Sequence, residues 1–253
     1  MFDLKGKTAL VTGSSQGIGR SVALLLAEHG ARVIINWRSN DEVAARTMAD
    51  LDAMNASYLT WKYDLSSDTV REDFEKFMKD NGVKVDILVV NASVQVRNSW
   101  ENITAEEFDT QMHTNLRASL SLIQACVPGM REKHWGRIVT VGSVQQYRPN
   151  TAMAVYAASK AGQRNLVMTL SVQLAADGIT INNVAPGVVD TIRNVKVLSD
   201  PAYKAKILRS IPVGFAASPD DIAPAIILLC SDEGKYITGV DLPIDGGMSI
   251  PFT

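Results

Sequence analysis

A tyrosine and a lysine lie four residues apart in the segment AVYAASKAG, residues 154–162. The segment has the composition of a helix, so Tyr156 and Lys160 are expected on one helical face. A lysine held beside a phenol lowers the phenol's pKa from about 10, so that it can exchange protons near neutral pH. The alternative is a half-buried aromatic ring beside a solvated lysine, which is the commoner meaning of this spacing.

A glycine-rich segment near the start of the chain has the spacing of a phosphate-binding loop. It reads TGSSQGIG, residues 12–19, between an apolar run and a helical pattern. Gly13 would allow a tight turn, Gly17 a close approach of the backbone to a pyrophosphate, and Gly19 close packing of the helix. The free amides at the helix N-terminus would attract the phosphates. An ordinary glycine-rich turn is the alternative, but the position after the first apolar run favours a dinucleotide site.

The elements that must position these residues alternate along the whole chain. The helical patterns cover residues 17–29, 41–54, 67–81, 104–133 (with a break that the pattern allows), the segment around 156–160, and 218–230. The apolar runs are KTALVT, RVIIN, SYLTWKY, DILVVN, RIVTVGS, ITINNVAP and VDLPID. Nearly continuous apolar strands separated by helices predict an α/β fold, a doubly wound parallel sheet covered by helices on both faces. Ligands bind such sheets at the carboxyl ends of the strands.

Several residues mark where helices begin or end. Gly30 is placed to end the first helix. Thr104 and Glu107 have capping-box spacing, and Ser218 followed by Pro219 predicts a helix start. With no linker, repeat or low-complexity segment, residues 1–253 are expected to form a single domain.

Composition excludes several classes of function. The chain has 25 Lys and Arg against 27 Asp and Glu, a formal charge of -2, so no basic field favours nucleic acid. No stretch approaches the ~20 apolar residues of a membrane span, and MFDLKGKTALVTG lacks a secretory signal, so we expect a cytoplasmic protein. Cys126 and Cys230 lie in apolar helical runs, and the three histidines are scattered, so no disulfide or metal site is expected.

The chain resembles the short-chain dehydrogenase/reductase family along essentially its whole length, in the single-domain branch that includes 3-oxoacyl-carrier-protein reductases. TGSSQGIG resembles the family's cofactor loop and YAASK its active-site motif. Ser143, at the end of RIVTVGS, and Asn115, in HTNLR, match the two remaining members of the family's catalytic tetrad. APGVVDT (185–191) and YITGVDLPIDGG (236–247) match segments near the cofactor and at the end of the fold. The resemblance implies a Rossmann-type fold.

The resemblance also implies a role for each member of the tetrad. Tyr156 would be the general acid in reduction and the base in oxidation, and Lys160 would stabilise its phenolate and hold the ribose hydroxyls. Ser143 would donate a hydrogen bond to the substrate oxygen. Asn115 would help to hold a water that connects Lys160 to solvent.

The cofactor contacts follow from the same resemblance, with one departure. This chain has Ser93 where the family often has the glycine of Asn-Asn-Ala-Gly, so the geometry of the loop expected beside the nicotinamide is left open. The expected contacts are Gly13, Ser15, Gln16, Gly17, Ile18, Gly19, Arg38, Ser39, Asp64, Leu65, Asn91, Ala92, Tyr156, Lys160, Val189 and Thr191.

The end of the second apolar run bears on which nicotinamide cofactor is used. An acidic residue there would bind the adenosine ribose and repel a 2′-phosphate, but RVIINWRSN (32–40) has Trp37 in that place. Arg38 and Ser39 follow and are suited to a phosphate. Asp41 and Glu42 lie too far along the chain to take over binding of the adenosine ribose. We therefore expect NADP(H) rather than NAD(H), the alternative being that Arg38 is a solvated loop charge.

The substrate is predicted to be a small, polar carbonyl or alcohol compound. Gln95, Gln145, Gln146 and Tyr147 are expected near the pocket mouth, with Gln95, Gln145 and Tyr156 as substrate contacts. Residues 194–215 are expected to form a helical flap, with Pro201 and Pro212 near its ends. Solvent-facing glutamines are the alternative.

Two other functions remain open at this point. One is a 3-oxoacyl-thioester reductase, for which MREKHWGR (130–137) is a candidate surface for an acidic carrier protein. The other is a non-catalytic NADP(H)-sensing protein. The resemblance further implies a homotetramer or homodimer.

Overall fold

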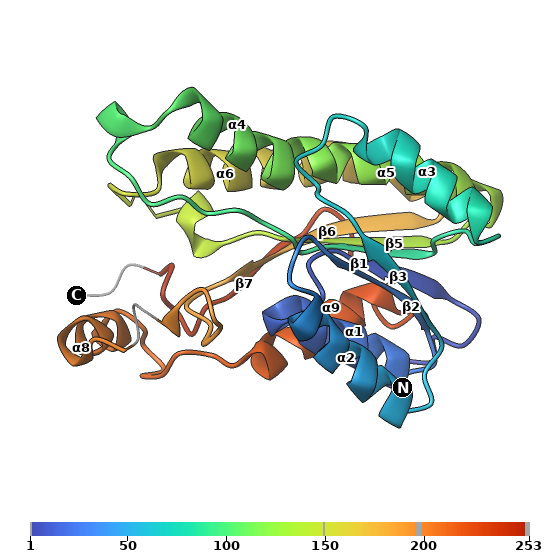
Figure 1. Cartoon of the computed structure of the whole chain (residues 1–253), viewed down its shortest axis with the longest axis horizontal. Coiled ribbons are helices and arrows are strands. Elements are labelled where there is room, and N and C mark those ends of the chain that lie inside the picture. The colour runs from blue at the N-terminus through green and yellow to red at the C-terminus, as the bar shows by residue number, and fades with distance from the viewer. Residues whose placement is uncertain (1, 149, 196–198, 251–253) are drawn as a thin grey trace.

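In a computed structural model of the chain, the fold is built around one parallel sheet (Figure 1). Its strands lie in the order β3-β2-β1-β4-β5-β6-β7. The structure describes residues 2–148, 150–195 and 199–250. The strands are β1 (Thr8–Val11), β2 (Arg32–Trp37), β3 (Tyr58–Lys62), β4 (Ile87–Val90), β5 (Gly136–Val141), β6 (Ile179–Pro186) and β7 (Asp241–Ile244). β1, β4, β5 and β6 are almost entirely buried, as expected of parallel strands covered on both faces.

Helices cover both faces of this sheet (Figure 1). One face carries α3 (Val70–Asp80), α4 (Ala105–Met112), α5 (Ala118–Glu132) and α6 (Ala154–Leu174); the other carries α1 (Gly17–Glu28), α2 (Asp41–Ala53) and α9 (Pro219–Cys230). A further helix, α8 (Pro201–Arg209), lies apart from both layers. The predicted doubly wound α/β fold is confirmed. No helix in the described ranges is both long and apolar enough to cross a bilayer.

The predicted helix signals are present. The Thr104 hydroxyl accepts from the Glu107 N–H at 3.1 Å, and the Glu107 carboxylate accepts from the Thr104 N–H at 3.0 Å. The Asp221 carboxylate accepts from the Ser218 N–H at 2.7 Å at the start of α9. The allowed break in the 104–133 pattern is a π-helical turn, His113–Arg117, between α4 and α5.

The two cysteines lie in separate hydrophobic cores on opposite faces of the sheet. Cys126 on α5 belongs to the core beneath α3 and α5, and Cys230 at the end of α9 belongs to the core beneath α1 and α9. Neither thiol is more than 1% exposed, and burial raises the pKa of both.

Strand order reverses at β1, because β2 and β4 flank it while the following strands continue past β4. Loops after β1 and β4 therefore diverge at the carboxyl edge of the sheet and leave a crevice between them. This crevice is where the residues singled out in the sequence come together.

Candidate active site

A cleft of ≈ 480 Å³ opens at the carboxyl ends of the strands. The loops after β1 and β2 line one end, with Ser15, Gln16 and Arg38, while Ser143 and Tyr156 line the other. The remaining predicted cofactor contacts that line it are Gly13, Gly17, Ile18, Ser39, Asn91, Ala92, Val189 and Thr191.

The loop after β1 needs its glycines, and its geometry fits a pyrophosphate. Gly13 and Gly17 have φ angles of 61° and 58°, in the left-handed region that other residues rarely adopt. A Cβ on Gly19 would lie 2.4 Å from the Gly13 carbonyl oxygen, so Gly19 allows α1 to pack against the turn. The N-cap of α1, Gln16, makes no side-chain cap and the first turn has no acidic residue. The first amides of α1 are therefore available to an anion.

Asn36 supports this loop, and the sequence analysis missed it. It is buried within β2, where its Oδ1 accepts from the Gly13 N–H at 3.1 Å. From the other side, Thr12 Oγ1 accepts from the Asn91 N–H at 2.9 Å, and Asn91 Nδ2 donates to the Thr12 carbonyl at 2.9 Å. A polar residue inside the apolar run RVIIN was the available signal.

The end of the cleft beside the loop after β2 is basic. Arg38 and Ser39 line it and are exposed. The Asp41 carboxylate is engaged nearby, because it accepts from Trp37 Nε1 at 2.8 Å and from Lys62 Nζ at 2.7 Å. Asp41 does not line the cleft, so no carboxylate among the described lining residues faces Arg38.

Like Gly19 and Lys160, the expected contacts Asp64 and Leu65 are not among the described residues that line the cleft. Asp64 Oδ1 accepts from the Ser66 N–H at 2.9 Å, forming a turn after β3. Leu65 is 5% exposed and packs in the core beneath α3. Their adenine-flanking role stays a prediction.

Ser143 and Tyr156 both line the other end of the cleft. Ser143 follows β5 as the N-cap of the short 3-10 helix η3 (Val144–Gln146), and its hydroxyl accepts from the Gln145 N–H at 3.2 Å. Tyr156 lies in the first turn of α6 and is 4% exposed. Lys160, one turn later, places Nζ 6.0 Å from the centroid of the Tyr156 ring.

Lys160 is buried behind Tyr156 rather than exposed in the cleft. It is 1% exposed, and its Nζ donates to the Val141 carbonyl at 2.7 Å and to Gln163 Oε1 at 3.1 Å. Burial, together with the positive charge of Arg193, lowers the pKa of Lys160 to about 7. The solvated lysine that the alternative interpretation required is therefore absent.

Asn115 sits in the π-helical turn and is completely buried. Its side chain accepts from the Val94 N–H at 2.8 Å and donates to the Val94 carbonyl at 2.9 Å, fixing the loop after β4. Its own carbonyl accepts from Ser119 Oγ at 2.8 Å and from Gln163 Nε2 at 3.2 Å. In this structure the Gln163 amide thus links Asn115 to Lys160, a connection that the sequence analysis missed.

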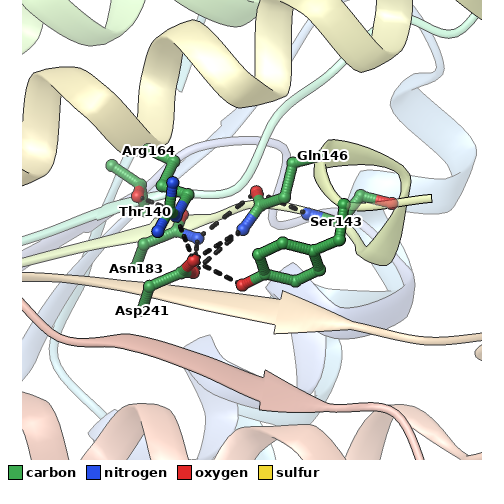
Figure 2. Close-up of polar contacts among 7 residues, drawn as sticks. Thr140, Ser143, Gln146, Arg164, Asn183 and Asp241 are labelled. Carbon is green, nitrogen blue, oxygen red and sulfur yellow. Dashed lines mark hydrogen bonds and ion pairs between the residues drawn. The ribbon is translucent and has the colours of Figure 1, made fainter. Parts of the chain in front are cut away.

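Asp241, at the start of β7, organises a polar cluster behind Ser143 (Figure 2). Gln146 Nε2 and Asn183 Nδ2 donate to its carboxylate at 2.9 and 2.7 Å. The Tyr147 hydroxyl and Arg164 Nε donate to it as well. One carboxylate therefore joins β6, β7, α6 and η3.

This cluster reaches Ser143 through Gln146. Gln146 Oε1 accepts from the Ser143 N–H at 3.5 Å, while its Nε2 donates to Asp241 (Figure 2). Gln146 and Tyr147, both expected at the pocket mouth, are turned toward Asp241 instead and are not among the described lining residues. That expectation is corrected, because Asp241 offers them a charged acceptor.

The expected substrate contacts Gln95, Gln145 and Tyr156 all line the cleft. Gln145 Oε1 is buried and has no hydrogen-bond partner among the described residues. Of the predicted flap 194–215, Asn194 and Ile207 line the cleft, Ile207 from α8. Residues 196–198 of that segment lie outside the described part of the chain.

The chain is similar to known proteins over nearly its whole length. The family model described as "Enoyl-(Acyl carrier protein) reductase" matches residues 13–249. The chain is 38% identical over 247 residues to a 3-oxoacyl-[acyl-carrier-protein] reductase of Vibrio cholerae, covering 98% of this chain and 99% of the relative. It is 34% identical over 250 residues to 3beta-hydroxysteroid dehydrogenase 1 of Eggerthella lenta, covering 98% and 95%. A crystal structure of a gluconate 5-dehydrogenase from Burkholderia cenocepacia, in complex with NADP and tartrate, superposes with a TM-score of 0.92 at 30% identity, covering 99% and 98%.

Proposed function

Since the chain belongs to the short-chain dehydrogenase/reductase family, and is therefore an NAD(P)-dependent oxidoreductase of CH–OH and C=O groups, we propose that it uses NADP(H) and acts on a small, oxygen-rich substrate. The observation that carries the substrate proposal is the buried Gln145 Oε1, which has no donor among the described residues. An unpaired buried amide oxygen costs free energy that a substrate hydroxyl would recover.

The proposed reaction uses the side chains gathered at the end of β5. The bound nicotinamide supplies or accepts the hydride. Tyr156 gives its phenolic proton to the substrate oxygen in reduction and takes it back in oxidation. Ser143 donates a hydrogen bond to the same oxygen, and the buried ammonium of Lys160 favours the phenolate.

The preference for NADP(H) is proposed from Arg38 and Ser39, supported by the relative solved with NADP. Arg38→Ala should raise the KM for NADPH ten- to a hundredfold, because a hydrogen bond between charged groups contributes about 1.5–3 kcal/mol. The KM for NADH, which lacks the 2′-phosphate, should barely change. Equal losses for both cofactors would show that Arg38 has only a structural role.

The substrate proposal is tested with Gln145→Leu on the best substrate from a carbonyl and alcohol panel. The KM for substrate should rise about tenfold while the dissociation constant of NADPH stays within about twofold. Gln173→Leu, which alters an exposed glutamine of α6, is the matched control. Unchanged kinetics in Gln145→Leu, or a best substrate that is a long acyl thioester, would refute a polar pocket.

The 3-oxoacyl-thioester reductase is the second candidate, favoured by the similarity to the Vibrio cholerae enzyme. In segment 130–137, two of the positive charges that an acidic carrier protein would contact are already paired with carboxylates. Arg131 pairs with Asp177 at 2.7 Å and Lys133 with Asp86 at 2.6 Å. This segment also ends in the first residues of β5, at the edge of the sheet opposite Ser143. Turnover of a 3-oxoacyl thioester would favour this candidate, and no turnover of any carbonyl would favour an NADP(H)-sensing protein.

We also propose a homotetramer or homodimer assembled through α4, α5 and α6. Apolar side chains are exposed on these helices: Phe108 (47%), Leu120 (38%), Met168 (43%) and Val172 (81%). Sedimentation showing a monomer at micromolar concentration would contradict this assembly.

A further inference from the structure

Gln163 on α6 links two members of the expected catalytic tetrad from the interior of the fold. It is completely buried, although glutamine is mostly exposed in proteins. Its Oε1 accepts from Lys160 Nζ at 3.1 Å, and its Nε2 donates to the Asn115 carbonyl at 3.2 Å and to Ser119 Oγ at 2.8 Å. An ammonium group can only donate and a carbonyl can only accept, so these neighbours allow the amide one orientation.

The ammonium of Lys160 has two acceptors in the described part of the chain, and Gln163 supplies one of them. The other is the Val141 carbonyl at 2.7 Å. Both oxygens are neutral, so they replace part of the lost hydration without cancelling the charge. Loss of either acceptor would therefore make the buried ammonium more costly to keep.

The other groups around this ammonium do not neutralise it. The centroid of the Tyr156 ring lies 6.0 Å from Nζ, and Arg193, after β6, adds a second positive charge. The π-helical turn and α5 contribute the neutral Asn115 and Ser119. No carboxylate accepts from Nζ among the described residues. The positive charge of Lys160 therefore acts on the Tyr156 phenol at full strength.

The Asn115 carbonyl, where this link ends, is fully used. It accepts from Ser119 Oγ at 2.8 Å as well as from Gln163, which occupies both lone pairs of the oxygen. The resemblance to the family implied a water, held with the help of Asn115, that connects Lys160 to solvent. In this chain the Gln163 amide by itself reaches from Lys160 to Asn115.

We propose that Gln163 is a positioning residue of the reaction, which holds the ammonium of Lys160 behind Tyr156 and takes the place of a water between Lys160 and Asn115. This inference rests on the roles of Tyr156 and Lys160 in the proposed function. An amide donates and accepts hydrogen bonds but does not titrate near neutral pH. The link therefore anchors the lysine and carries no proton, and protons for Tyr156 enter from the cleft, which Tyr156 lines.

Two substitutions separate an anchoring amide from a residue that only fills space. Gln163→Met fills the same space with apolar atoms, so it removes the acceptor and excludes water. Gln163→Ala leaves a cavity bounded by three polar atoms, Lys160 Nζ, Ser119 Oγ and the Asn115 carbonyl oxygen. About two to four polar partners suffice to hold a buried water, so one should enter and accept from Lys160. Gln163→Ala should therefore keep more activity than Gln163→Met, although it loses more packing.

The measurement is kcat/KM of the whole protein for oxidation of its best alcohol substrate with NADP⁺, from about pH 6 to pH 10. Gln163→Met should lower the maximum about tenfold. It should also move the loss of activity on the alkaline side about one unit lower in pH, because an ammonium with fewer acceptors gives up its proton more readily. Gln163→Ala should show less than half of this shift.

Asn182→Leu is the matched control. Asn182 on β6 is an equally buried amide, but it donates to the Ile237 carbonyl and accepts from the Val240 N–H, away from Lys160. This variant should be less stable to urea than wild type, as Gln163→Met should be, and should keep the wild-type pH profile. An equal shift of the profile in Asn182→Leu would show that any buried amide has this effect and would refute a specific role of Gln163.

The outcomes distinguish this inference from the proposed function. A wild-type alkaline limb in Gln163→Met, or lower activity in Gln163→Ala than in Gln163→Met, refutes the positioning role and leaves Tyr156 and Lys160 in theirs. Turnover retained by Tyr156→Phe would instead refute the proposed reaction, and the inference with it.

Discussion

Lys160 carries its ammonium group almost out of reach of water, and its acceptors in the described part of the chain are the neutral oxygens of Val141 and Gln163. Hydrogen bonds to neutral oxygens recover part of the hydration that the charge loses on burial. The remaining cost appears as the pKa lowered to about 7. A charge kept at such a cost is typical of a functional site.

The burial of Lys160 makes the free energy of unfolding depend on pH in a direction that can be measured. The folded pKa is near 7 and the unfolded value near 10.5, so the unfolded chain binds more protons between these pH values. The free energy of unfolding therefore decreases as the pH falls through this window. Lys160→Met should be more stable than wild type by about 2–4 kcal/mol at pH 7, with the difference shrinking toward pH 10. Urea unfolding at pH 7 and pH 9.5 tests this, and a difference independent of pH would contradict it.

Tyr156 can be tested by removing a single oxygen. Tyr156→Phe should reduce kcat to below a few per cent of wild type, because the ring remains and only the proton donor is lost. The dissociation constant of NADPH, from fluorescence titration, should change by less than about threefold. Substantial residual turnover would mean that another group transfers the proton.

The sequence revealed some of these residues and concealed others for a physical reason. Tyr156, Lys160 and the glycines of residues 12–19 depend on spacing within one helix or one turn, which local sequence displays. Gln163 acts through a bond to a residue 48 positions away, and no local pattern marks it. Asn36 stands out only as a polar residue in an apolar run, and its partner Gly13 lies 23 positions away.

At the scale of elements, η3 is a single turn of three residues that must hold Ser143 and Gln145 in place. So short a helix has little stability of its own. Its position comes from Asp241 on β7, which receives hydrogen bonds from Gln146 and Tyr147 at the end of η3. Asp241 on β7 thereby helps to position Ser143, which follows β5.

Asp241→Asn should therefore impair catalysis more than cofactor binding. The amide loses the charge that pairs with Arg164 and one of two acceptor oxygens. We expect kcat to fall about tenfold, with the NADPH dissociation constant nearly unchanged. Asp232→Asn, which loses the ion pair with Arg137 away from η3, is the control for stability loss alone. Equal effects on kcat in both variants would show that Asp241 has no positioning role.

Element types and approximate bounds were predictable because strands and helices here have distinct apolar periodicities. The π-helical form of the turn His113–Arg117 was not, since the 104–133 pattern allows a break but does not indicate its place or its geometry. Its geometry follows from the bonds of Asn115 to Val94 and of Gln163 to the Asn115 carbonyl, which only the folded chain brings together.

At the scale of the whole molecule, the alternation of strands and helices predicted a parallel sheet. The order of the strands depends on which strands pair with each other, and the alternation does not reveal that. The reversal at β1 decides where the cleft lies. It brings the first residues of the loops after β1 and β4 into contact before the loops diverge: Thr12 Oγ1 accepts from the N–H groups of Asn91 and Ala92, 79 and 80 residues further along the chain. Local sequence marks each loop but does not state that they meet.

Because the two thiols lie in separate cores, their rates of chemical labelling can show which helical layer detaches from the sheet first. A disulfide-exchange reagent can reach Cys126 or Cys230 only when the layer above that thiol detaches from the sheet. If the seven strands and both helical layers open as one cooperative unit, Cys126→Ala and Cys230→Ala should label at the same rate, set by global unfolding. Saturating NADPH should slow both rates by the same factor, since it binds only the native state. Faster labelling of one thiol would show that its layer opens first, and would identify the less stable face of the sheet.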